Sequence, residues 1–185
     1  MTKKEVRKVV NNSILNGKTK QEIFEELKET SHRSHQDLAK IIRTVPSLQA
    51  RTKYKQLNII LIVLLAITIL GKIAMGTSII SASGISIIIA NWFSFFFILP
   101  VVDIFLLIGV VTYSQNSHIY IAIWTFFCMS HIIQFERFLF VILVAIIGLG
   151  IFLNSKLYPK YQTVKERYKD SQGQTRIRNV IKFED

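Results

Sequence analysis

Asp103 is the residue whose type and position most strongly predict chemistry. It lies inside a long apolar run, three residues after Pro100. A helical proline donates no backbone hydrogen bond, so the carbonyl of Phe96 is expected to lack its usual partner. An ionisable side chain within a bilayer costs about 2.5–3.5 kcal/mol on insertion scales, and it usually faces protein, water or a partner. Asp103 is therefore either an ion or proton site at a broken helix, or a protonated carboxyl that bonds a neighbouring helix.

Four further polar side chains are expected near the outer half of the same membrane region, namely Lys72, Asn91, His131 and Glu136. They could form one cluster in which Lys72 neutralises Glu136. The alternative is that each acts locally: Lys72 extends to the interface, Glu136 lies in an exposed turn, and His131 caps a local contact. Long charged side chains reach the interface readily, which favours this alternative.

Metal binding and catalysis have weaker signals. Cys128 and His131 stand three residues apart, on one face of a helix, but zinc takes about four ligands and Asp103 would have to be the third. The sequence contains no nucleotide-binding loop, no paired His/Glu zinc motif and no nucleophile elbow, and Gly148 and Gly150 favour close helix packing. We expect no cofactor, no metal and no enzymatic activity.

These side chains all belong to one apolar block. Residues 56–153 contain only four charged side chains: Lys72, Asp103, Glu136 and Arg137. The block is long enough for four transmembrane helices, expected at 57–75, 85–113, 119–135 and 138–153, with turns at 76–84 and 114–118 and with His118 at the interface. The last two spans are only about 25 Å long, so a re-entrant hairpin is the alternative.

Charge defines the orientation of the block. Residues 1–55 carry 13 Lys and Arg against 6 Asp and Glu, and residues 154–185 carry 8 against 4, so the net charge of +11 lies in the two ends. Lys and Arg are retained on the cytoplasmic side during insertion. We expect an inner-membrane protein with both termini in the cytoplasm, which agrees with an even number of spans.

The first 46 residues are expected to form a cytoplasmic module of three helices. The first covers 3–16, with Gly17 as its left-handed cap; the second covers 20–30 behind a Thr19–Glu22 capping box; the third starts after Ser34 and ends before Pro46. The expected core comprises Val6, Val9, Val10, Ile14, Leu15, Ile23, Phe24, Leu27, Leu38, Ile41, Ile42 and Val45. Residues 47–56 are expected to run as a juxtamembrane helix into the first span.

The carboxy-terminal tail, residues 155–185, is expected in the cytoplasm. Alternating Ile177, Ile181 and Phe183 behind the turn-forming residues 170–173 favour a small β-hairpin. An isolated hairpin is only marginally stable, so it must dock on the amino-terminal helices or on a partner, or stay disordered.

The expected fold is thus an all-α integral membrane protein of four transmembrane helices with a small cytoplasmic module and a short tail. Its first expected function is a membrane-anchored interaction, scaffold or regulatory module that binds a protein partner, a second copy or anionic lipid. The second is a small transporter or channel component built around Asp103.

The third expected function is a membrane-tethered DNA-binding regulator. Residues 19–27 resemble the opening of a helix-turn-helix, but the stretch from Leu27 to Ser34 is longer than the usual turn. Glutamates at 22, 25, 26 and 29 also lower the local positive potential. Nucleic acid is therefore the less expected partner.

Overall fold

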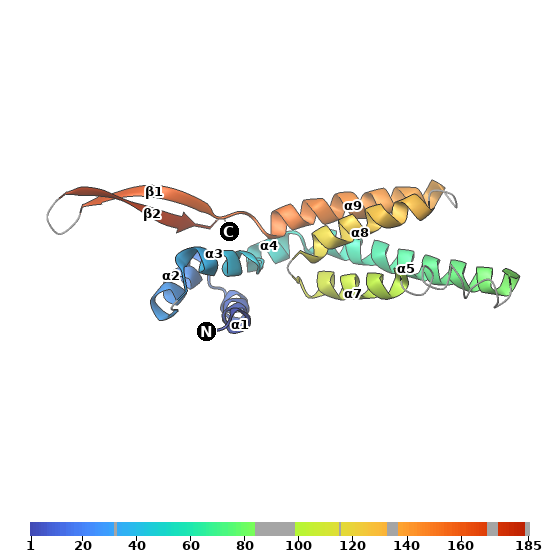
Figure 1. The fold of residues 1–185 in the computed structure, drawn as a ribbon, viewed down its shortest axis with the longest axis horizontal. Helices are drawn as coiled ribbons and strands as arrows, with labels where there is room; N and C mark the ends of the chain where they lie inside the picture. Colours follow the sequence, from blue (N-terminus) through green and yellow to red (C-terminus); the bar gives the residue numbers. More distant parts are fainter. Residues whose placement is uncertain (32, 84–98, 115, 133–136, 170–173, 184–185) are drawn as a thin grey trace. The chain divides into compact units, whose positions relative to one another are not determined.

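The computed structural model is mostly helical, with one two-stranded sheet (Figure 1). It describes residues 1–31, 33–83, 99–114, 116–132, 137–169 and 174–183. The chain divides into two compact units, one made of residues 1–53 and 156–185 and the other of residues 54–155. The carboxy-terminal tail therefore belongs with the amino-terminal helices, although about a hundred residues separate them in the sequence.

The first three helices begin at polar caps that the sequence supplies. They are α1 (Lys3–Leu15), α2 (Lys20–Thr30) and α3 (His35–Arg43). Thr2 and Thr19 each close a capping box with a glutamate three residues on, and Ser34 caps α3. Gly17 follows α1 with φ +85°, where a side chain would be strained. The three expected helices are confirmed, with ends shifted by one residue, or by two at the end of α3.

These helices share one core with the tail. Its buried residues are Val6, Val10, Ile14, Ile23, Phe24, Leu27, Leu38, Ala39, Ile41, Ile42, Val45 and Ile181. The prediction was wrong for Val9 and Leu15, which are exposed. The buried positions of α1 are spaced four apart, and each of these two residues lies about 100° round the helix from that stripe.

Residues 47–56 were expected to run into the first span as one continuous helix, and this prediction was wrong. A short helix, α4 (Leu48–Lys53), starts after Pro46, and a turn at Tyr54 separates it from α5 (Lys55–Ser83). Arg51 of α4 donates to Oδ1 of Asn11 at 2.9 Å, which attaches α4 to α1. Residues 48–53 therefore belong to the first unit.

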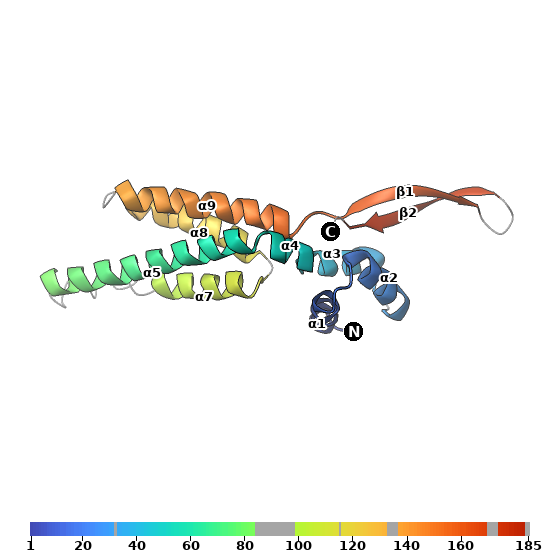
Figure 2. The same cartoon turned by 180° about the vertical axis from the view of Figure 1, so that it is seen from behind.

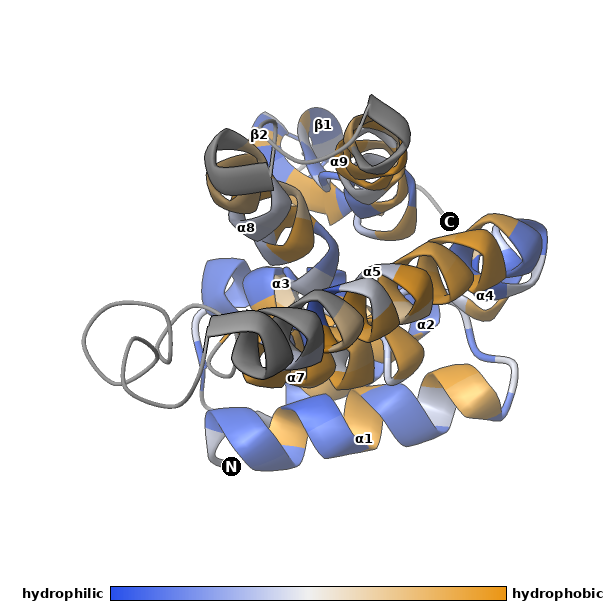
Figure 3. Ribbon diagram, turned by 90° about the vertical axis from the view of Figure 1, so that its right-hand side faces the viewer, coloured by the Kyte–Doolittle hydropathy of each residue, from blue (hydrophilic) through white to orange (hydrophobic). Residues whose placement is uncertain are grey.

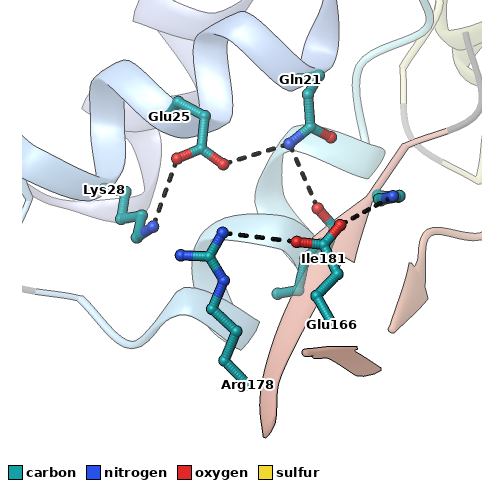
Figure 4. A network of polar contacts seen from close by, with 7 residues as sticks. Gln21, Glu25, Lys28, Glu166, Arg178 and Ile181 are labelled. Carbon is teal, nitrogen blue, oxygen red and sulfur yellow. Dashed lines mark hydrogen bonds and ion pairs between the residues drawn. The ribbon is translucent and has the colours of Figure 1, made fainter. Parts of the chain in front are cut away.

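The expected hairpin is confirmed. Strands β1 (Gln162–Lys169) and β2 (Thr175–Lys182) pair antiparallel, with Thr163 opposite Ile181 and Lys169 opposite Thr175. Its end is attached to α2: the side chain of Gln21 donates to the carbonyl of Ile181 at 3.4 Å and accepts from the amide of Phe183 at 3.3 Å. Figure 4 shows the first of these bonds beside the ion pairs of α2 and the hairpin.

The second unit consists of four apolar helices in the described residues: α5, α7 (Leu99–Val111), α8 (Ser117–Ile132) and α9 (Arg137–Leu157). Within them, 55–74 and 140–157 are long and apolar enough to cross a membrane, whereas 99–111 and 117–129 are shorter apolar segments. Helix α5 packs against α7, and α7 against α8. The amino-terminal half of the expected second span, 85–98, lies outside the described residues.

The turn expected at 76–84 is wrong over 76–83. Helix α5 continues without a break to Ser83. This stretch contains Gly76 but no proline, so every backbone N–H can still donate, and Oγ1 of Thr77 bonds the carbonyl of Ala74 at 2.8 Å. Glycine and serine lower helix propensity by about 1 kcal/mol at most, which the surroundings of a helix readily override.

The second unit reverses the usual distribution of polarity. Its outward side chains are apolar, with Leu70, Phe105 and Val141 65–70% exposed, whereas its buried polar residues are Asn58, Thr68, Asp103, Ser117, His118 and Thr125. Figure 3 shows the apolar character of these helices and the alternating polar and apolar stripes of α1. A soluble bundle buries its apolar faces and exposes its polar ones.

Candidate functional site: a buried ion pair among apolar helices

Asp103 is bound on both of its carboxylate oxygens. The ammonium of Lys72 donates to Oδ2 at an Nζ–Oδ2 distance of 2.5 Å, and the indole N–H of Trp124 donates to Oδ1 at 2.8 Å. The Lys72 nitrogen also lies 3.8 Å from Sγ of Cys128. Asp103 is 4% exposed and the Lys72 side chain 11%, so the pair is shielded by protein. We call these four residues the buried polar cluster.

The cluster joins three helices: Lys72 comes from α5, Asp103 from α7, and Trp124 and Cys128 from α8. Trp124 and Cys128 stand four residues apart and so share one face of α8. They follow His118 by about 9 and 15 Å along the helix at ~1.5 Å per residue.

A second polar pair lies near the start of α5 and α8. Nε2 of His118 is 2.9 Å from Oδ1 of Asn58, and both residues are buried. His118 had been expected at the interface, because it follows a polar turn in the sequence. The cue that could have identified the pair is Asn58, a lone amide in the apolar start of α5, since such groups bond across helices in membrane bundles.

Two glycines allow the helices to approach closely at the same end. A Cβ at Gly109 of α7 would meet Oγ of Ser117 at 2.5 Å, and one at Gly150 of α9 would meet the carbonyl oxygen of His118 at 2.7 Å. Gly148, expected to share this packing role, would meet nothing within 4 Å. Only Gly150 of that pair lies at a helix contact.

The structure describes only part of the expected outer cluster. Asn91 and Glu136 lie outside the described residues, and so does the side chain of His131, although its backbone belongs to α8. One interpretation of the sequence had the Lys72 ammonium reach the membrane interface. It instead forms an ion pair with Asp103, a pairing that the sequence analysis did not propose.

Helix α7 is described from Leu99 onward, so Pro100 is its second described residue. The expected break at Pro100 depends on the residues before it and stays a prediction. Phe96, whose carbonyl was expected to be freed, lies outside the described residues.

The donor set does not favour a metal ion. Among the described residues, His, Cys, Asp and Glu side chains form no group of three that could bind one. The Cys128 sulfur faces the Lys72 ammonium, a cation that competes with a metal for the same lone pairs. The cluster can hold α5, α7 and α8 in one register. The Lys72 ammonium and the Asp103 carboxylate each have their partners on the other two helices, so each is satisfied only when those helices are in place.

The chain matches no known family model, and no curated protein or solved structure shows significant similarity to it.

Proposed function

We propose that the chain is a multi-pass inner-membrane protein that anchors a cytoplasmic binding module. Residues 54–155 cross the bilayer four times, and residues 1–53 with 156–185 form the module. The module recognises a partner; the membrane unit anchors it and catalyses no reaction.

The observation that carries this proposal is the reversed polarity of the second unit. Phenylalanine, leucine and isoleucine side chains cover its outside while a Lys–Asp pair lies inside. Water would favour the opposite arrangement by about 25 cal/mol per Å² of apolar surface. Lipid favours the observed one, because it solvates apolar side chains and leaves charges to pair within the protein.

The charge of the two units supports the orientation. Residues 1–53 and 156–185 carry 20 Lys and Arg against 10 Asp and Glu, and residues 54–155 carry 3 against 2. The whole first unit is thus basic, as expected of segments retained in the cytoplasm.

The buried polar cluster supports a structural role for Asp103 over the transport alternative. Both carboxylate oxygens already have protein donors, and the residue is almost fully shielded. An ion pathway would need at least one oxygen open to the ion or to water. We therefore assign the pair to fixing the helix arrangement from which the module is presented.

The proposal is tested by cysteine accessibility in a Cys128→Ala background. Single cysteines replace Asn12, Thr112, Glu136 and Asn179, and cells receive a membrane-impermeant maleimide before or after permeabilisation. We expect Glu136→Cys to react in intact cells and the other three to react only after permeabilisation. Reaction of Asn12→Cys or Asn179→Cys in intact cells contradicts the orientation.

A further inference from the structure

The connection between the second and third helices has the length found in helix-turn-helix pairs. Helix α2 ends at Thr30 and α3 begins at His35, so four residues connect them, and both pack on α1. The stretch from Leu27 to Ser34 had been compared with the usual turn, but its first residues, up to Thr30, belong to α2. A turn of three to four residues is typical of DNA-binding helix pairs, in which the second helix enters the major groove.

The outer face of α3 carries groups that can bind base edges and phosphates. Leu38, Ala39, Ile41 and Ile42 are buried, which leaves Gln36, Lys40 and Arg43 on the opposite face at spacings of four and three. Gln36 and Lys40 are exposed. Glutamine pairs with adenine, and lysine and arginine pair with guanine or with phosphate.

Both faces of the hairpin are basic, and they differ in ion pairing. On one face, Glu166 accepts from Lys182 at 3.0 Å and from Arg178 at 3.5 Å (Figure 4), and these bonds lower the pKa of Glu166. On the other, Lys165, Arg167 and Lys169 alternate along β1, and within the described residues none of them forms an ion pair.

Lys165, Arg167 and Lys169 lie on the same face of the hairpin as Ile181, which docks on the helices. Thr163 and Ile181 form a cross-strand pair on the same side as Lys165 and Arg167, because side chains alternate with period two. Ile181 is buried in the helical core, and Phe183 packs on Phe24 with ring centroids 5.7 Å apart. From that docked end the strands extend away as a two-stranded ribbon (Figure 2).

We propose that this unit binds duplex DNA, with α3 in the major groove and the Lys165–Arg167–Lys169 row on the phosphate backbone. The inference deepens the proposed function, on which it rests, by naming the class of partner. Three of the four glutamates of α2 are engaged locally, which reduces their opposition to a polyanion: Glu25 pairs with Lys28, Glu26 pairs with Lys18, and Glu22 closes the cap at Thr19.

Duplex DNA fits this surface better than an anionic membrane does. Helices that bind lipid surfaces expose an apolar face that enters the headgroup region. The apolar faces of α1, α2 and α3 are instead buried against each other. The exposed face of α3 consists of hydrogen-bonding and charged groups, which have more to bind at base edges than at a layer of lipid headgroups.

The test uses the full chain in a neutral maltoside detergent and a fluorescein-labelled 30-base-pair duplex of random sequence. Affinity is measured by anisotropy at several salt concentrations. A hairpin variant, Lys165→Gln/Arg167→Gln/Lys169→Gln, is compared with an α1 variant of equal charge loss, Lys3→Gln/Lys4→Gln/Lys8→Gln. We expect the hairpin variant to bind at least about tenfold more weakly and to flatten the log–log salt slope by about three, whereas the α1 variant stays near wild type.

Selection from the same random duplex pool tests α3. Wild type should enrich a common sequence, and Gln36→Ala should lose that preference while keeping the salt slope. Equal weakening by both charge variants, or no duplex binding, overturns the inference. Hairpin-dependent binding to phosphatidylglycerol vesicles without duplex binding also overturns the inference and identifies anionic lipid as the partner. These outcomes leave the proposed membrane topology standing, because only the cysteine labelling tests the orientation.

Discussion

At the scale of single residues, the Lys72–Asp103 pair constrains how α5 and α7 of the second unit are arranged. A buried pair adds little net stability, since desolvation of the two charges offsets their attraction. Removing one partner, however, leaves an uncompensated charge and typically costs about 3–5 kcal/mol. The pair therefore penalises helix arrangements that separate α5 from α7 more than it stabilises the observed one.

Asp103→Leu should lower the free energy of unfolding by about 3 kcal/mol or more, because the Lys72 ammonium loses its partner. Lys72→Met/Asp103→Leu should recover most of that loss, since both charges are then replaced by apolar groups. Denaturation in mixed detergent micelles measures both, with Ile104→Leu on the exposed face of α7 as the control. Equal destabilisation by the single and the double variant would show that the pair does not act as a unit.

The sequence predicted the importance of Asp103 but not its partners. An ionisable residue in an apolar run stands out in any reading of the chain. Lys72 and Trp124 are 31 and 21 residues from Asp103, and only the packing of α5, α7 and α8 brings them together. The pairing of His118 was not predicted for the same reason, since its partner Asn58 belongs to another helix.

At the scale of elements, capping chemistry was the most reliable guide. The start of α2 at Lys20 matches the prediction because Thr19 and Glu22 satisfy otherwise unpaired amides. The continuation of α5 from Gly76 to Ser83 could not be predicted in this way, since Gly76 and the serines that follow permit either a turn or a helix. Tertiary surroundings decide such segments.

The Glu22 cap predicts an acid-sensitive first turn of α2. Hydrogen bonds from the backbone and side chain of Thr19 hold the pKa of Glu22 below its usual value. Ionised Glu22 therefore makes its full contribution to the stability of the fold above its unfolded pKa of about 4.5. That contribution disappears as the pH falls through the lower pKa of the folded state.

Glu22→Gln keeps a residue that can close the capping box but cannot titrate. We expect amides of α2 to lose hydrogen-exchange protection in wild type relative to Glu22→Gln as the pH falls from 6 to 3. The comparison is made at each pH, so intrinsic exchange rates cancel. A wild-type-to-variant ratio that stays constant over this range would contradict the role of the ionised side chain.

The contact of α8 with α9 predicts different responses at two neighbouring glycines. Gly150→Ala places a methyl group 2.7 Å from the carbonyl oxygen of His118, so the helices must separate, at a cost of about 1–3 kcal/mol. Gly148→Ala meets open space and should be neutral or slightly stabilising, because alanine favours helix. Thermal unfolding in detergent distinguishes them, and equal melting temperatures would show that α8 and α9 do not meet at Gly150.

At the scale of the whole molecule, the arrangement of charge along the sequence indicated a membrane unit between two basic ends. It did not indicate that these ends fold together, because the contact between Ile181 and the helical core spans more than a hundred residues. Long-range contacts of this kind leave no periodic signal in a single sequence. The alternation of Ile177, Ile181 and Phe183 indicated a hairpin but not where it docks.

The central claim is that the apolar outside of residues 54–155 faces lipid. It is tested most directly by a nitroxide spin label at Phe105, which is 70% exposed on α7, in a Cys128→Ala background in reconstituted bilayers. We predict frequent collisions with oxygen, which concentrates in lipid, and few with a water-soluble nickel chelate. Frequent collisions with the nickel chelate would place this surface in water and contradict the account.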